Sequence, residues 1–284
     1  MALARNLPAQ EDLVALTKTI HSYRFLTLPQ LRRLHPDLNP ADLNLAVRTR
    51  HIAAIRRPTM RARIPELVYA LDRAGADLLT DVLAIDRAQL KWRAHRNLIG
   101  LLFVEHRLAA NDVRIAMALG AERIGGELVH WYNEPAIEED VVDPVEGVPP
   151  LAFRPDAYLR LRFANGRTLN AFLEVDRSSE SYAKIAAKVR RYLVYKDQRL
   201  FRASVGARSF RVLFTVPSRR RLQSLKRVIE DADGQRMFWL ARTADVSDTD
   251  LGAPVWSVAG TKGAASLVGE MTPPQSLSDV HSSL

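Results

Sequence analysis

The stretch Arg154-Pro155-Asp156, followed across an Asn165-Gly166 turn by Phe172-Leu173-Glu174-Val175-Asp176-Arg177, determines the fold that we predict for the second half of this 284-residue chain. Apolar and polar residues alternate on both sides of the turn, which predicts two paired strands that each bury their odd-numbered side. The set predicted to be buried comprises Ala157, Leu159, Leu161, Phe163, Leu169, Ala171, Leu173 and Val175.

The length of the loop decides which residues of the two strands face one another. A two-residue loop at Asn165-Gly166 would make opposed residue numbers sum to 331 and would place apolar residues beside polar ones. A three-residue loop, Ala164-Asn165-Gly166 with the glycine left-handed in a bulge, makes the sum 330 and keeps the faces matched. In that register Asp156 lies opposite Glu174, with β-carbons about 5 Å apart.

Two carboxylates this close either share a proton or share a cation. The sequence therefore predicts a metal site for phosphodiester chemistry, with Mg²⁺ as the cofactor and Mn²⁺ as its substitute. Glu134, at the end of a strand predicted over 127–134, is a candidate third metal ligand. The alternative is a polar hairpin face whose acids are neutralised by nearby arginines, namely Arg160, Arg162 and Arg177.

Composition and charge restrict the class of protein. A hydrophobic content of 47% over 284 residues allows two domains, each with a core. The net charge of +9 and the pI of about 10.1 suit a polyanionic partner, and we expect double-stranded DNA. The absence of cysteine excludes disulfides and thiolate metal sites. There is no signal-peptide core and no apolar run of about 18 residues, so we expect a cytoplasmic protein without membrane contact.

The N-terminal region has the pattern of a winged helix-turn-helix. A helix is predicted over 11–23, Thr27 caps a second one, and Asn39-Pro40 opens a third. Residues 52–57 and 66–71 then form a predicted hairpin wing. The candidate DNA-binding residues are Asn44, Arg48 and His51 for base edges, and Arg56, Arg57, Arg61 and Arg63 for phosphates. The alternative is a protein-docking module with a solvated basic face.

The order of elements in the second half resembles the PD-(D/E)xK nuclease-like fold. The sequence pattern predicts a helical region over 87–123 with a break near Ala110-Asn111, three strands, a helix over 179–198 and a strand over 210–216. In that fold a Pro-Asp pair begins the second core strand and an acid-x-Lys element lies on the third. The resemblance assigns these places to Pro155-Asp156 and to Glu174-Val175-Asp176.

Asp176 stands where that fold has lysine, and an aspartate cannot orient the attacking water or neutralise developing charge as lysine does. Members of the fold can take the lysine from the next helix instead. Lys184 and Lys188 are available there, and Lys188 and Tyr192 lie one helical turn apart on the same side. The alternative for both lysines is a solvated or phosphate-binding helix face. The span 184–227 holds 14 basic residues and the single acid Asp197, and we expect it to follow a DNA backbone.

At the level of the whole chain, residues 10–245 resemble the replication-relaxation family of plasmids and other mobile elements. The resemblance implies a role in the replication and topology of extrachromosomal DNA, and it implies that Glu-x-Asp is this family's own version of the motif. The segments that carry it, besides the winged-helix start, are His106-Arg107-Leu108-x-x-Asn111-Asp112-Val113-Arg114, Leu128-x-x-Trp131-x-x-Glu134, Arg154-Pro155-Asp156-Ala157-Tyr158, Phe172-Leu173-Glu174-Val175-Asp176-Arg177, Lys188-x-Arg190-x-Tyr192, Arg211-Val212-Leu213-Phe214 and Phe238-Trp239.

We therefore expect an α+β or α/β protein with a winged helix-turn-helix domain over 8–85, a nuclease-like αβββαβ domain over 86–258 and a disordered tail over 259–284. The expected function is DNA binding in plasmid replication or DNA relaxation, with Mg²⁺-dependent nicking. The alternative is a non-catalytic transcriptional regulator or replication initiator that uses the same fold as a DNA clamp. A homodimer stays open, because winged helices often bind palindromes as dimers. The candidate catalytic residues are Asp156, Glu174, Asp176, Lys184 and Lys188, and the candidate metal ligands are Asp156, Glu174 and Glu134.

Overall fold

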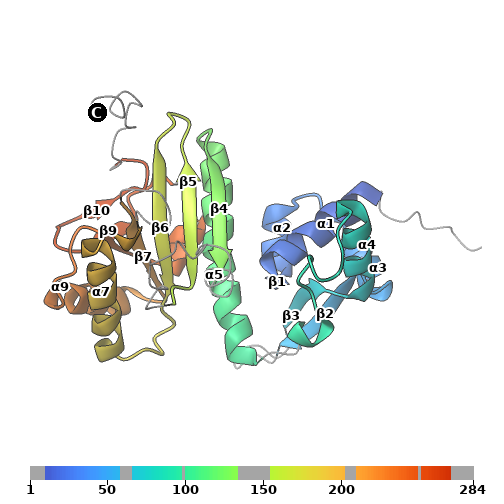
Figure 1. Cartoon of the computed structure of the whole chain (residues 1–284), viewed down its shortest axis with the longest axis horizontal. Helices are drawn as coiled ribbons and strands as arrows, with labels where there is room; N and C mark the ends of the chain where they lie inside the picture. The colour runs from blue at the N-terminus through green and yellow to red at the C-terminus, as the bar shows by residue number, and fades with distance from the viewer. Residues whose placement is uncertain are drawn as a thin grey trace, which may run out of the picture. The chain divides into compact units, whose positions relative to one another are not determined.

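The computed structural model describes residues 10–57, 66–97, 100–133, 154–201, 209–248 and 251–269. The fold is α+β, and the chain divides into two compact units, residues 1–111 and 112–284, which we describe separately (Figure 1). Across the described ranges, no helix combines the length and the apolar character needed to cross a membrane.

The first unit packs helices around a small antiparallel sheet with the strand order β1-β3-β2. Two of its helix starts confirm the predicted caps. Thr27 and Gln30 form a reciprocal capping box at the start of α2, and Asn39 accepts a hydrogen bond from the Ala41 amide at the start of α3, where Pro40 is the first residue. The elements are α1 (Gln10–Tyr23), β1 (Leu26–Thr27), α2 (Leu28–Leu34), α3 (Pro40–Arg48), β2 (Ile52–Arg57), β3 (Glu66–Leu71) and α4 (Arg73–Leu83).

The helical region predicted over 87–123 differs from the structure. Turns and a short 3-10 helix, η1 (Ala94–Asn97), come first, and α5 (Leu101–Arg123) then runs through Ala110-Asn111 without a break. Asn111 is fully buried, and its amide donates to the carbonyls of Tyr23 and Phe25 at 3.1 and 2.6 Å. This polar residue therefore serves a tertiary contact and does not end the helix.

The start of α5 also explains why the chain divides later than the predicted boundary between residues 85 and 86. Val104 and Leu108 pack with Phe25 and Val68 in the core of the first unit. The side-chain amide of Gln30 donates to the Leu108 backbone carbonyl at 2.9 Å. The first turns of α5 thus belong to the N-terminal unit, and the division falls within this helix, after residue 111.

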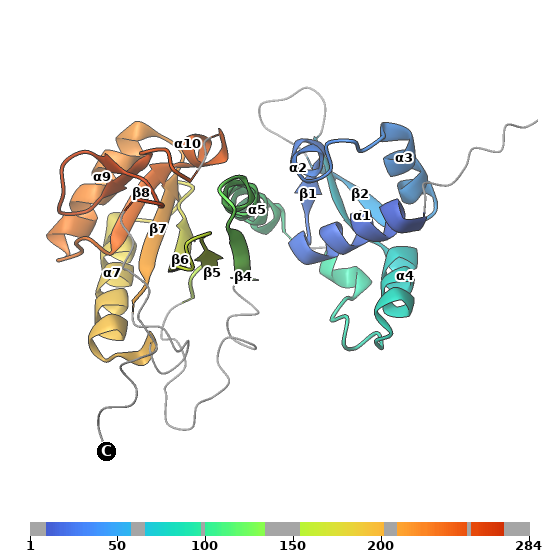
Figure 2. The same ribbon diagram turned by 90° about the horizontal axis from the view of Figure 1, so that it is seen from above.

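The second unit is built on a seven-stranded mixed sheet with the order β10-β9-β8-β7-β6-β5-β4. Helices α7 and α9 cover one face, and the second part of α5 covers the other (Figure 2). The strands β6, β7 and β8 are parallel, and the predicted order of a helix, three strands, a helix and a strand is present. The elements after α5 are β4 (Glu127–Asn133), β5 (Ala157–Arg162), β6 (Thr168–Val175), α7 (Tyr182–Asp197), β7 (Arg211–Val216), α9 (Arg219–Asp231), β8 (Phe238–Arg242), α10 (Thr243–Asp248), β9 (Trp256–Val258) and β10 (Ala264–Ala265).

The hairpin of β5 and β6 has the predicted register. Ala157 pairs with Leu173 and Arg162 pairs with Thr168, so opposed residue numbers sum to 330. Gly166 has a φ of +78° and donates to the Phe163 carbonyl at 2.9 Å, as expected for a left-handed glycine in a three-residue loop.

The expectation that these strands bury only their odd-numbered side is wrong. The even-numbered Tyr158 and Phe172 lie in the core beneath α7 and α9, together with Tyr192. Because helices cover both faces of the sheet, polar even-numbered residues such as Asn170 and Glu174 are buried as well.

The tail predicted to be disordered from residue 259 begins with ordered structure. β10 pairs with β9, and Ala259 and Leu267 are buried. The Lys226 ammonium donates to the Thr261 carbonyl at 2.7 Å, so contacts with α9 hold this small, polar segment in place. Residues 270–284 lie outside the described ranges.

Candidate functional site

The centre of the candidate site is Glu174, near the carboxyl end of β6. Its Oε2 accepts a hydrogen bond from the Lys188 ammonium at 2.7 Å, and its Oε1 accepts one from the Tyr192 hydroxyl at 2.6 Å. Glu174 is 2% exposed and Tyr192 is fully buried. A buried carboxylate requires such partners, and here the two oxygens receive one charged and one neutral donor.

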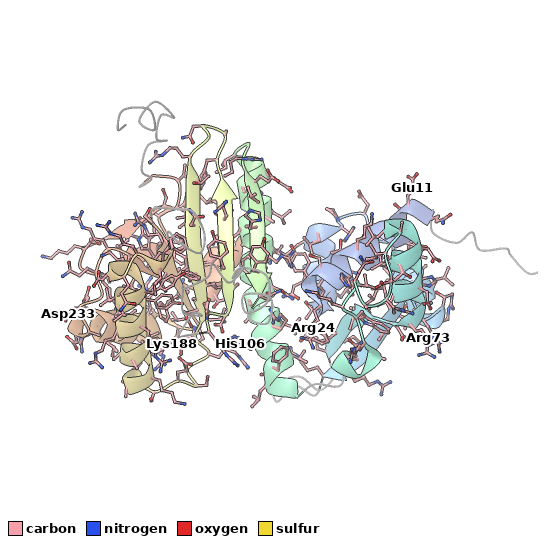
Figure 3. All side chains as sticks on the ribbon, in the orientation of Figure 1. Glu11, Arg24, Arg73, His106, Lys188 and Asp233 are labelled. Carbon is pink, nitrogen blue, oxygen red and sulfur yellow. The ribbon has the colours of Figure 1, made fainter. Side chains whose placement is uncertain are left out.

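Helix α7 brings Lys188 and Tyr192 to Glu174. Ser181 caps the helix by accepting a hydrogen bond from the Lys184 amide, and Ile185 and Val189 anchor its apolar side in the core. Lys188 and Tyr192 lie one turn apart, so both reach the same carboxylate. Figure 3 labels Lys188 among the side chains of the second unit. The predicted shared direction of these two side chains is therefore confirmed.

Asp156 lies beside Glu174, one residue before β5. Its backbone amide donates to the Leu173 carbonyl at 3.0 Å, and its Oδ2 accepts from the Val175 amide at 2.6 Å. The first bond departs by one residue from the pairing of β5 and β6, because 156 and 173 sum to 329, and the second joins the Asp156 carboxylate to the residue that follows Glu174. After burial, the negative charge of Asp156 is a further cause that raises the pKa of Glu174, so the two carboxylates lie near each other. The predicted neighbourhood of the two carboxylates is present in the structure.

The charges of this group depend on one another. Burial raises the pKa of Glu174 to about 7, although Lys188 favours the charged form. Burial alone would lower the pKa of Lys188, but Glu174, Asp156 and Glu180 outweigh burial and raise it. Glu180 lies 3.1 Å from the Lys188 ammonium. The ammonium therefore keeps its proton at neutral pH, and Glu174 gains a proton more readily than an exposed glutamate does.

Asp176, two residues after Glu174, is held by an arginine. The guanidinium of Arg221 contacts both of its carboxylate oxygens at 2.7 and 2.9 Å, and it also donates to the Glu180 carbonyl at 2.7 Å. Asp176 is 6% exposed, so this two-point ion pair compensates for the loss of water around the acid. The side chain of Asp176 is therefore engaged in binding Arg221.

Two arginines of the alternative hairpin interpretation have contacts with other side chains. Arg160 donates to Asn170 at 2.8 Å, and Arg162 forms an ion pair with Glu127 across the neighbouring strand. Arg177 is exposed. Of the two candidate lysines, Lys188 reaches Glu174, whereas the side chain of Lys184 is exposed on the first turn of α7.

The donor set around Glu174 decides whether a metal ion fits. Asp156 and Glu174 offer hard oxygen donors, and Mg²⁺ binds proteins through one or two carboxylates while keeping several waters. The two residues therefore fit Mg²⁺ chemically. Among the residues that the structure describes, no group of three or more His, Asp or Glu side chains could hold a metal ion. Glu134, the predicted third ligand, lies outside those residues.

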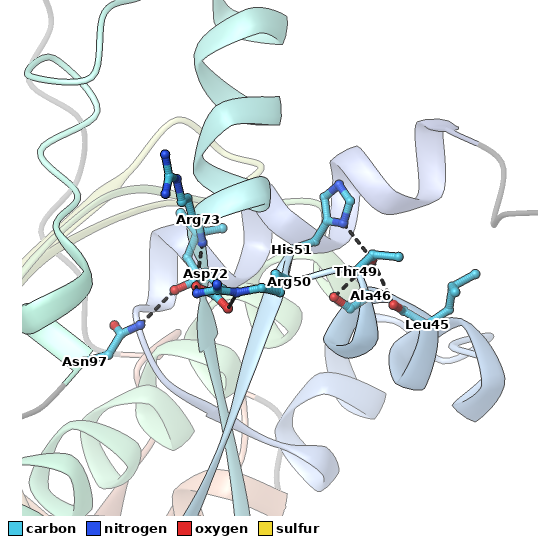
Figure 4. A network of polar contacts seen from close by, with 9 residues as sticks. Leu45, Ala46, Thr49, Arg50, His51, Asp72, Arg73 and Asn97 are labelled. Carbon is cyan, nitrogen blue, oxygen red and sulfur yellow. Dashed lines mark hydrogen bonds and ion pairs between the residues drawn. The ribbon is translucent and has the colours of Figure 1, made fainter.

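The face of α3 carries part of the predicted DNA-binding set. Asn44 and Arg48 are exposed on the helix. His51 is not on that helix, because α3 ends at Arg48 and Arg50 adopts a left-handed φ of +60°. The Nδ1 atom of His51 lies 2.8 Å from the Thr49 hydroxyl (Figure 4). Burial lowers the pKa of His51.

The arginines of the hairpin that were predicted to contact phosphates differ in their surroundings. Arg56 is exposed on β2. Arg57 forms an ion pair with Glu66, its cross-strand partner, and lies 3.8 Å from Glu105. These acids compete with phosphate for its guanidinium. Arg61 and Arg63 lie outside the described ranges.

Sequence reasoning missed Glu180 and Arg221. Arg221 is the third residue of α9, after the Ser218 cap, and it reaches Asp176 across the parallel crossover from β6 to β7. The only sequence signal was a run of three arginines, Arg219 to Arg221, directly after Ser218, a residue type that favours the start of a helix. Nothing in that run identifies which arginine turns inward.

Comparison with known proteins gives the family of the chain. No curated protein matches it in sequence. The replication-relaxation family profile matches residues 18–207, a range that includes most of the first unit and the site up to Lys188 and Tyr192. It ends before Arg221, which is outside the matched range. Since this match covers more than half of the sequence, the protein belongs to the replication-relaxation family.

Proposed function

We propose that this protein binds double-stranded DNA and acts in the replication or relaxation of a mobile genetic element, and that its second unit nicks DNA with the help of Mg²⁺. The observation that carries the proposal is the 2.7 Å contact between the Lys188 ammonium and Glu174, beside Asp156. It supplies from α7 the lysine that the motif lacks at Asp176. Family membership supports the coarser statement of a role in replication or relaxation.

Each residue of the site has a distinct task in this proposal. Asp156 and Glu174 would hold the ion. Bound Mg²⁺ would polarise the phosphodiester and lower the pKa of a water ligand. Lys188 stays protonated and would stabilise negative charge that develops on the phosphate oxygens. Tyr192 fixes the orientation of Glu174, and Asp176 with Arg221 fixes the chain between β6 and α7.

The first unit would find the DNA site as a winged helix. Its order of helix, strand, two helices and a two-stranded hairpin supports this proposal. Asn44 and Arg48 would contact base edges from α3, and Arg56 would contact a phosphate from the hairpin. A second copy of the chain on a palindromic site is compatible with this arrangement.

A second candidate function is a DNA clamp without catalysis, as in a transcriptional regulator or a replication initiator. The observation that favours it is the engagement of both Glu174 oxygens by Lys188 and Tyr192. Asp176 is likewise held by Arg221. In this alternative Lys188 and Arg221 supply the positive charge that compensates the buried carboxylates, and no metal ion is needed.

Incubation of supercoiled plasmid with Mg²⁺ or Mn²⁺ separates the two candidates. The variants are Asp156→Ala and Glu174→Ala, with Lys188→Ala compared with Lys184→Ala, the exposed lysine on the same helix. All are compared at equal DNA occupancy, after thermal melting has shown that they are folded. The nuclease proposal expects metal-dependent nicked product from wild type and Lys184→Ala alone.

Binding without nicking in wild type would overturn the nuclease proposal and support the clamp. Equal nicking by wild type and the Glu174→Ala and Asp156→Ala variants would also overturn it, because the cleavage would then come from another site or from a contaminant.

A further inference from the structure

Tyr182, the first residue of α7, is an aromatic side chain on the surface next to the acid site. Among the described residues, the large apolar side chains that remain exposed are Leu or Val with this one exception, and Tyr182 is 47% exposed. An exposed aromatic ring offers a flat apolar face on which a ligand ring can stack. Its position just after the Ser181 cap places it beside the segment that leads from β6.

Arg221 fixes the ring of Tyr182. Its guanidinium carbon lies 4.9 Å from the centre of the ring, over the ring face. Arg221 is in turn held by Asp176 and by the Glu180 carbonyl. Hydrogen bonds with Ser224 and Arg221 lower the pKa of the Tyr182 hydroxyl. Arg221 covers one face of the Tyr182 ring and holds the ring in one orientation. The rest of the ring is the part that a ligand can reach.

The charges around this ring favour an anionic ligand. Lys184, Arg219 and Arg220 are exposed near the first turns of α7 and α9. The positive charges of Arg221 and Arg220 also act on Tyr182 and lower its pKa. An aromatic ring among exposed cations is the combination that binds single-stranded nucleic acid, because bases stack on the ring while cations contact the phosphates.

The ring is also connected to the candidate catalytic residues through short contacts. Glu180 precedes Tyr182 by two residues, which limits the distance between their α-carbons to about 7 Å. The Glu180 carboxylate lies 3.1 Å from the Lys188 ammonium, which contacts Glu174 at 2.7 Å. A strand that places a phosphate at Glu174 would therefore pass close to Tyr182.

We propose that Tyr182, backed by Arg221, is a stacking platform for an unpaired base of a DNA strand whose phosphates contact Lys184, Arg219 and Arg220. The inference rests on the proposed DNA-binding function and specifies its substrate: the strand at the acid site is locally single-stranded, since a paired base is stacked between its neighbours. An acidic protein partner would use the cations but has no need of the ring.

The test measures binding without cleavage. Full-length protein is titrated, in EDTA, into a single-stranded oligodeoxynucleotide that carries 2-aminopurine, and into a duplex of the same sequence. The variants are Tyr182→Leu, which removes the ring, and Tyr182→Phe, which keeps it, with thermal melting as the folding control. We expect Tyr182→Leu to weaken single-strand binding about tenfold and to reduce the fluorescence change on binding. Tyr182→Phe should bind within about twofold of wild type, because the ring supplies the stacking.

Three results would overturn the inference: unchanged single-strand affinity in Tyr182→Leu, equal losses in the Leu and Phe variants, or competition by polyglutamate as effective as competition by the oligonucleotide. Because the assay contains no metal, failure of nicking leaves it unaffected. Conversely, intact nicking by Tyr182→Leu with unchanged single-strand binding would remove the stacking platform and leave the proposed function standing.

Discussion

The polar side chains on the face of α3 and those around Glu174 differ in their exposure to water. On α3, Asn44 and Arg48 are exposed, so water solvates them in the folded and unfolded states alike. At the candidate site, Glu174 and Asp176 are buried, and each has a cation in contact with it. Substitutions on α3 should therefore affect ligand binding and leave folding intact. Substitutions at the candidate site should affect folding first, and any study of activity there has to separate the two effects.

Lys188→Met should give the largest effect on stability. It leaves Glu174 buried without its ammonium, and breaking a buried pair by removing one partner costs about 3–5 kcal/mol. Urea unfolding at pH 8 measures the loss. At pH 5 the loss should be smaller, because Glu174 can then take up a proton.

The double variant Lys188→Met, Glu174→Gln serves as the control for this prediction. It should recover part of the lost stability, since no buried charge remains at either position. If the double variant is less stable than Lys188→Met alone, the pair is not the source of the effect.

Arg221→Lys should give the next largest effect. Lysine keeps the charge beside Asp176 but cannot make two parallel bonds to the carboxylate and a third to the Glu180 carbonyl. We expect a loss of about 2 kcal/mol in the free energy of unfolding. Arg220→Lys, at the exposed neighbouring position, is the matched control and should leave stability unchanged. An equal loss in the free energy of unfolding in Arg221→Lys and Arg220→Lys would contradict the role given to Arg221.

The pH dependence of stability should report the burial of Glu174. Its pKa is about 7 in the folded protein, above the ordinary value of 4.5. Between these values the folded state binds more protons than the unfolded state, so this group lowers stability as pH rises from about 4.5 to about 7. The stability of Glu174→Gln relative to wild type should therefore increase over that range. If the free energies of unfolding of wild type and Glu174→Gln change in parallel with pH, the pKa of Glu174 is the same in the folded and unfolded states and the prediction is wrong.

Arg48→Ala should have the smallest effect on stability, within about 0.5 kcal/mol, because the side chain is exposed. Its affinity for a DNA site should fall about tenfold, the loss expected for one base contact. Fluorescence anisotropy with a labelled duplex measures the loss, and Asp42→Ala on the same helix is the control. Unchanged affinity in Arg48→Ala would favour the protein-docking interpretation of this unit.

These predictions separate what local sequence determines from what tertiary structure determines. The register of β5 and β6 follows from alternation and from one glycine, and the helix starts at Thr27, Asn39 and Ser218 follow from caps; all of these lie within a few residues of the feature that they fix. Helical spacing and a resemblance offered Lys184 and Lys188 as candidates, and the structure places Lys188 beside Glu174.

Arg221 could not be predicted in this way. It meets Asp176 because β6 and β7 are parallel neighbours and because α7 and α9 both begin at the same edge of the sheet. Asn111 and the ordered segment 259–269 were missed for a related reason. Their polar or small side chains look like breaks or tails in the sequence, and only distant contacts make them structural.

The loop of residues 164–166 has a consequence for how this protein can tolerate insertions and deletions. Eight residues of extended chain separate Gly166 from Glu174, a span of about 26 Å, so the loop is remote from the site. Loops of this kind usually accept changes in length. Here the loss of a single residue would shift the pairing sum, turn one strand over relative to the other, and move Asp156 away from Glu174. Among relatives of this protein, the length of this distant turn should therefore vary less than its sequence.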